Sequence, residues 1–143
     1  MNEPRMSESG WSPIPLALKI LAVVMLLWMV GAAMNLTNLM ENGLPLLGNF
    51  VFGALAATIV FVLDILGPVV FLSGLWLRKS WAVPWAVVYN GLFILNNSGA
   101  FLTVRDELGA PQSLVPTVAS ISFLGVILWQ RDYFRSGGAE HGD

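Results

Sequence analysis

The sequence predicts an all-α membrane protein, a bundle of four antiparallel transmembrane helices. Hydrophobic residues make up 56% of the 143 residues and charged residues only 11%, against about 25% charged residues in an average soluble domain. The hydrophobic residues form long continuous blocks rather than the spaced stripes of amphipathic surface helices. Within this apolar region, every charged residue except Asp64 lies near the end of a block.

The apolar blocks define the expected spans, each close to or longer than the roughly 20 residues that a helix needs to cross hydrocarbon. They cover residues 14–34, 49–77, 81–104 and 112–129. The second block is the longest, and its Gly67-Pro68 pair predicts a kink that absorbs the excess length. We therefore expect a transmembrane domain at 14–130, a polar leader at 1–13 and a flexible tail at 131–143.

The distribution of basic residues predicts the orientation of these spans. Residues 78–80 form a very short turn, so the second and third spans are expected to be antiparallel neighbours. With four spans, this turn and both termini share one side of the membrane. That side collects Arg5, Lys19, Arg78, Lys79, Arg131 and Arg135, against Arg105 on the other. The positive-inside rule then places both termini in the cytoplasm, in a multi-pass protein of the plasma or cytoplasmic membrane.

Asp64 is the most informative polar residue, because it lies near the middle of the second span. Insertion of an aspartate at the centre of a membrane helix costs about 2.5 to 3.5 kcal/mol, so a compensating partner is expected. Asn90 and Ser120 are the candidate partners, since they are predicted at a similar depth. Pro68 cannot donate to the carbonyl four residues back, which predicts a free acceptor at Asp64 itself.

Two further polar residues share helical faces with these candidates. Asn97 follows Asn90 by seven residues, and Thr117 precedes Ser120 by three. The candidate binding residues are therefore Asp64, Asn90, Asn97, Thr117 and Ser120. The functional interpretation is a proton-accepting or cation-binding site. The structural interpretation is a protonated Asp64 hydrogen-bonded to its neighbours, with asparagines that join helices, each contact contributing about 0.6 kcal/mol.

Several classes of site have no support in the sequence. Cysteine is absent, which excludes disulfides and thiolate metal sites. His141 is the only histidine and lies in the polar tail, so neither a metal site nor a histidine-based triad is expected. No cofactor is predicted, and the net charge of −2 without a basic run argues against nucleic-acid binding.

Three functions remain open. The first is a small integral membrane protein that acts as an accessory or binding subunit, with the lipid bilayer, a second copy or a larger membrane complex as partner; short loops favour it. The second is a small proton-coupled transporter that uses Asp64 as its intramembrane acid. The third is a membrane enzyme acting on a lipid or quinone, which ranks last because no nucleophile or metal set is recognisable.

Overall fold

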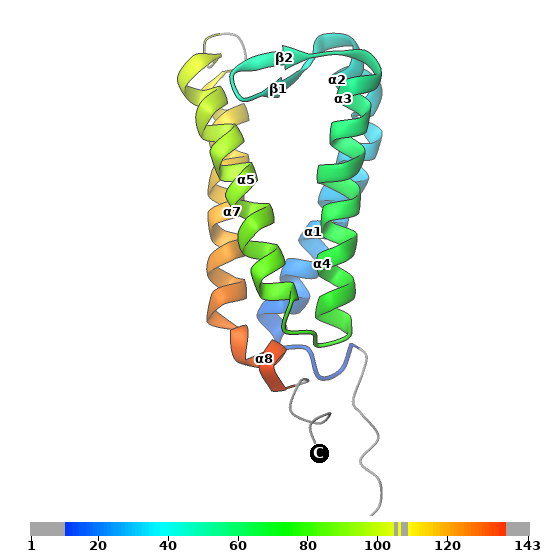
Figure 1. Ribbon diagram of the computed structural model, residues 1–143, viewed down its shortest axis with the longest axis vertical. Helices are drawn as coiled ribbons and strands as arrows, with labels where there is room; N and C mark the ends of the chain where they lie inside the picture. The colour runs from blue at the N-terminus through cyan, green and yellow to red at the C-terminus, as the bar shows by residue number, and fades with distance from the viewer. Residues whose placement is uncertain (1–10, 105, 107–108, 137–143) are drawn as a thin grey trace, which may run out of the picture.

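The computed structural model describes residues 11–104, 106 and 109–136, and it is mostly helical, as the sequence predicts. Figure 1 shows long helices running side by side along the main axis of the molecule. These are α1 (Leu16–Met34), the continuous rod of α3 (Gly53–Val60), η1 (Phe61–Leu66) and α4 (Gly67–Trp76), then α5 (Ala82–Thr103) and α7 (Ala110–Trp129), with short α2 (Leu36–Asn42) and α8 (Arg131–Ser136). Most of the expected leader, the end of the expected tail and the basic Arg105 lie outside the described residues.

Among the described residues, two helical segments are long and apolar enough to cross a membrane, Leu16–Met34 and Gly53–Trp76. In their most apolar stretches only 22% and 28% of the residues are buried inside the protein. α5 is long enough but less apolar, because it carries Asn90, Asn96 and Asn97. In α7, the part whose side chains the structure describes, Leu114–Trp129, is apolar but shorter than a full span. Length and composition thus give two candidate membrane-crossing helices in the described part of the chain.

The expected start of the second span is wrong. Residues 49–51 form strand β2 (Asn49–Val51), which pairs antiparallel with β1 (Leu44–Leu46), and the helix begins only at Gly53. The two-residue turn between these strands places Leu47 at φ 47° and Gly48 at φ 85°. Positive φ at both positions is the type I′ geometry that matches the twist of a β-hairpin.

The β1–β2 hairpin is held on α5 by the side chain of Asn96. Its amide Nδ2 donates to the carbonyl of Pro45 at 3.3 Å, and its Oδ1 accepts from the backbone N–H of Leu47 at 2.8 Å. A Cβ at Gly48 would lie 3.1 Å from Cβ of Thr103, so the hairpin tip also rests directly on the end of α5. As Figure 1 shows, the hairpin reaches from this end of α5 and α7 to α2 and α3.

Most of the buried hydrophobic core lies at the opposite end of the molecule, where α8, the start of α1 and the turn between α4 and α5 come together (Figure 1). Phe134 of α8 is fully buried and its ring lies 6.2 Å from that of Phe71. Tyr133 donates from its hydroxyl to the carbonyl of Leu75 at 3.2 Å, and the guanidinium of Arg78 lies 5.0 Å from its ring. The short α8 therefore seals this end by packing against α4 and the turn.

Candidate functional site

The middle of the second long rod is a π-helix, η1, and Pro68 provides a reason for it. The backbone N–H of Gly67 bonds to the carbonyl of Val62, five residues back. In the same register Pro68 faces the carbonyl of Leu63, to which it has no N–H to donate. The hydroxyl of Tyr89 donates to that carbonyl instead, at 2.8 Å. The free acceptor was expected at Asp64; the π register moves it to Leu63.

Tyr89 can reach this carbonyl because residue 67 is a glycine. A Cβ at Gly67 would lie 2.8 Å from Cδ2 of the Tyr89 ring, closer than real Cβ contacts. The indole of Trp85, one turn earlier on α5, donates to the carbonyl of Gly67 at 3.2 Å. Two aromatic side chains of α5 thus fasten the rod at its π-helical segment, where the backbone hydrogen bonding changes register.

Asp64 points from η1 towards α1, where Oδ1 of its carboxyl group accepts a hydrogen bond of 2.8 Å from the indole Nε1 of Trp28. The expected partners Asn90 and Ser120 do not supply this bond. Counted from the shared end, Trp28 and Asp64 each lie twelve residues into their rods, whereas Asn90 and Ser120 lie eight and nine residues into theirs. That difference is about 5 Å at 1.5 Å per residue, nearly one turn.

Sequence reasoning missed Trp28, although it carries a recognisable signal. The other tryptophans lie near one end of the apolar blocks, but Trp28 lies in the middle of α1. A buried indole N–H normally finds an acceptor, and in hydrocarbon the acceptor has to come from another helix. A tryptophan and a carboxyl group at equal depth on neighbouring helices therefore predict this pair.

Asn90 and Ser120 are brought together at the contact of α5 and α7, and both are buried, with 2% and 7% of their surface exposed. The Nδ2 of Asn90 donates to the carbonyl of Ala86, in its own helix, at 2.9 Å. Within the residues that the structure describes, neither Oδ1 of Asn90 nor Oγ of Ser120 has a hydrogen-bond partner. Both side chains instead border a cavity between the helices.

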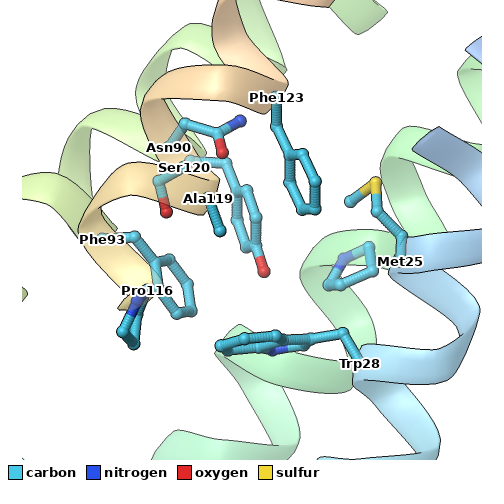
Figure 2. A pocket seen from close by; sticks show the side chains of 10 residues that line it. Met25, Trp28, Asn90, Phe93, Pro116, Ala119, Ser120 and Phe123 are labelled. Atoms are coloured by element: carbon cyan, nitrogen blue, oxygen red, sulfur yellow. The ribbon is translucent and has the colours of Figure 1, made fainter. Parts of the chain in front are cut away.

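Figure 2 shows this cavity, with Met25 and Trp28 of α1 facing residues of α5 and α7 across it. Its space totals about 340 Å³ including the part open to the outside. The space within it that water can occupy has room for only about one or two molecules. The lining combines four aromatic rings with two prolines and few polar groups: Met25, Trp28, Pro68, Tyr89, Asn90, Phe93, Pro116, Ala119, Ser120 and Phe123.

The cavity has a buried floor and a half-buried rim. Asn90 and Ser120 belong to the floor, while Trp28, Phe93 and Pro116 are only partly buried. Each of these three rim residues lies on the hairpin side of its helix relative to the floor residues of that helix. On α1 and α5 the burial of the lining thus decreases towards the hairpin half, whereas on α7 the lining is partly buried on both sides of Ser120, at Ala119 and at Phe123.

The remaining candidates lie outside this cavity. Asn97 is half buried on α5 and donates from Nδ2 to the carbonyl of Phe93, in its own helix, at 2.8 Å. Thr117 is half buried on α7 and does not line the cavity. Of the three asparagines of α5, only Asn96 contacts another element through its side-chain hydrogen bonds among the described residues.

The cavity thus offers the hydrogen-bonding atoms of Asn90 and Ser120 among aromatic side chains. The carboxyl group of Asp64 lies outside it and is hydrogen-bonded to the lining residue Trp28. Among the described residues no three His, Asp or Glu side chains gather in a group that could hold a metal ion. No family model, no curated protein and no solved structure matches this chain.

Proposed function

We propose that this chain is a four-span integral membrane protein of the binding or accessory class, whose helices hold a membrane-soluble ligand in the cavity beside Asn90 and Ser120. The observation that carries the proposal is a pair of buried polar residues, Asn90 and Ser120, whose Oδ1 and Oγ atoms have no protein partner among the described residues and which line an apolar cavity. Polar groups inside proteins are almost always hydrogen-bonded, to protein or to ordered water, so a molecule in the cavity is expected to supply the partner.

The distribution of apolar side chains supports embedding of the whole bundle in lipid. Large hydrophobic residues point outward on every long helix, among them Leu27 with 66% of its surface exposed, Leu55 with 58%, Leu95 with 62% and Val118 with 60%. A soluble monomer rarely exposes contiguous apolar patches of more than a few hundred Å². Lipid surrounding the bundle removes that cost, and it extends the span assignment from two helices to α5 and α7.

The orientation is inferred from the residues at the α8 end of the bundle. Lys19, Arg78 and Lys79 lie at this end, with Trp76 and Trp81 beside them and partly exposed. Cationic and tryptophan side chains together favour a cytoplasmic membrane interface. The amine of Lys19 already reaches back to the carbonyl of Ser12 at 3.3 Å, as expected for a lysine that extends from apolar surroundings towards water.

A variant that fills the cavity tests the binding proposal. Ala119→Leu on α7 adds volume to the lining, and Ala54→Leu on the exposed side of α3 is the matched control. After purification in mild detergent, native mass spectrometry of the wild type and of the control should show a retained small molecule, which the Ala119 variant loses. The proposal is contradicted if all three proteins retain the same amount of the small molecule, or if the wild type retains none.

The runner-up is a proton-coupled transporter, and the bond between Asp64 and Trp28 favours it because Trp28 also lines the cavity. A change in the protonation of Asp64 would act on the cavity wall through this single contact. Asp64→Asn keeps an oxygen that can accept from Trp28 but cannot exchange a proton. Loss of proton-driven uptake in vesicles, with folding preserved, favours the transporter; unchanged uptake or no uptake in the wild type removes it.

A further inference from the structure

We infer that the cavity takes a neutral, lipid-soluble molecule whose head carries a hydroxyl or carbonyl oxygen, bound between Asn90 and Ser120. This inference rests on the proposed binding function and adds the chemical class of the ligand. Its starting point is the narrowness of the cavity, in which the space that water can occupy has room for only about one or two molecules. A compact oxygen-bearing group fits that space, and the apolar remainder of the ligand extends through the aromatic rim.

The polar atoms of Asn90 and Ser120 define the hydrogen-bonding pattern expected of the ligand's head. One N–H of Asn90 is used by the carbonyl of Ala86, which leaves Oδ1 as an acceptor and the second N–H as a donor. The hydroxyl of Ser120 both donates and accepts. A ligand hydroxyl can donate to Oδ1 of Asn90 and accept from Ser120, and a ligand carbonyl can accept from either residue. An alkane head satisfies neither.

The absence of charge in the lining selects a neutral ligand. No charged side chain is among the residues that line the cavity in the described part of the chain. Asp64 is hydrogen-bonded to the lining residue Trp28, but Asp64 itself does not line the cavity. A cation or an anion in this position would lose its hydration without gaining a counter-charge, which is costly in hydrocarbon.

The aromatic part of the lining fits the rest of such a ligand. Phe93, Phe123 and Trp28 present their rings to the cavity (Figure 2). The aromatic and proline side chains of the lining add two hydrogen-bonding groups, and both are already used: the indole N–H of Trp28 donates to Asp64 and the hydroxyl of Tyr89 donates to Leu63. An acyl chain, an isoprenoid tail or a flat ring can pack there, so a lipid alcohol and a quinone are two sources of the same head chemistry.

Photolabelling in detergent-solubilised full-length protein tests the ligand class. The probes are an octanol that carries a photoreactive diazirine and the corresponding diazirine octane. The variants are Ser120→Ala and Asn90→Leu. The matched controls are Ser122→Ala and Asn97→Leu. Ser122 is exposed on the same helix as Ser120. Asn97, like Asn90, donates to the carbonyl four residues back in its own helix, but it lies outside the cavity.

The octanol probe should label lining residues of the wild type and of both controls, as mapped by peptide mass spectrometry. Loss of one hydrogen bond should lower labelling by about two- to tenfold in each cavity variant. Displacement by unlabelled 1-octanol or by a naphthoquinone supports the inference, and displacement by only one of them identifies the source; displacement by neither overturns it. If the octane probe labels the lining equally, the cavity binds ligands but the head chemistry is wrong. If neither probe labels it, while Ala119→Leu also changes nothing, water fills the cavity and the binding function fails as well.

Discussion

Removal of the indole N–H at Trp28 should destabilise the bundle through Asp64. Trp28→Phe keeps an aromatic ring in the cavity wall but removes the donor of the 2.8 Å bond to Oδ1 of the carboxyl group. Side-chain hydrogen bonds between membrane helices average about 0.6 kcal/mol and reach about 1.7 kcal/mol. Asp64 has no other hydrogen bond among the described residues. We therefore expect the loss of this bond to lower the free energy of unfolding by about 1 to 1.7 kcal/mol, in the upper part of the range measured for such bonds.

A double-mutant cycle separates this bond from the packing of the ring. The four proteins are the wild type, Trp28→Phe, Asp64→Leu and the double variant, and the free energy of unfolding is measured in mixed micelles by titration with a denaturing detergent. The coupling energy should be about 1 to 1.7 kcal/mol. Trp76→Phe, at a tryptophan with 47% of its surface exposed, is the control and should change stability by less than about 0.5 kcal/mol. A coupling energy near zero refutes the pairing of the two side chains.

The other predictions concern the π-helical segment, the hairpin and the topology. Tyr89→Phe should lower the free energy of unfolding by about 1 to 3 kcal/mol, because it leaves the partly buried carbonyl of Leu63 without a donor. In a Pro68→Ala background the new backbone N–H can take over, so the same change should cost clearly less; equal costs contradict this account. Asn96→Ala should speed proteolysis of the hairpin, whereas Asn97→Ala should not. A reporter inserted after Ser80 should lie on the same side as both termini; opposite sides refute the four-span topology.

The helix bounds were largely predictable from the sequence because hydrophobic blocks and their polar ends report directly on solvent. The expected span at 14–34 compares with α1 at Leu16–Met34, and the expected span at 81–104 with α5 at Ala82–Thr103. The start of the second span was placed too early because Phe50 and Val51 of β2 extend the apolar run of the helix that comes after them. The turn of the hairpin also has a leucine, Leu47, at a position where asparagine, aspartate or glycine gives the usual signal.

The roles of the asparagines were less predictable, because an asparagine in a helix has two competing partners. Asn90 and Asn97 each donate to the carbonyl four residues back, so this half of the amide is satisfied without another helix. Asn96 instead bonds across to the hairpin with both of its polar atoms. All three residues are asparagines in one helix, so the sequence does not distinguish them. The hairpin, which was not predicted, determines that Asn96 is the one that joins two elements.

The direction in which Asp64 points depends on the π-helix and therefore on Pro68. Depth along a helix is obtained by counting residues at 1.5 Å each, but direction around it is given by 3.6 residues per turn only while the helix is regular. A π-helical segment adds residues to its turns and rotates the rest of the helix by about 100° for each added residue. Counting from the regular α4 to Asp64 with an α-helical period therefore gives the wrong face. The proline that withdraws a donor from Leu63 also changes the register in which the acid lies, so the carboxyl group meets Trp28 on α1 and leaves Asn90 and Ser120 to face the cavity.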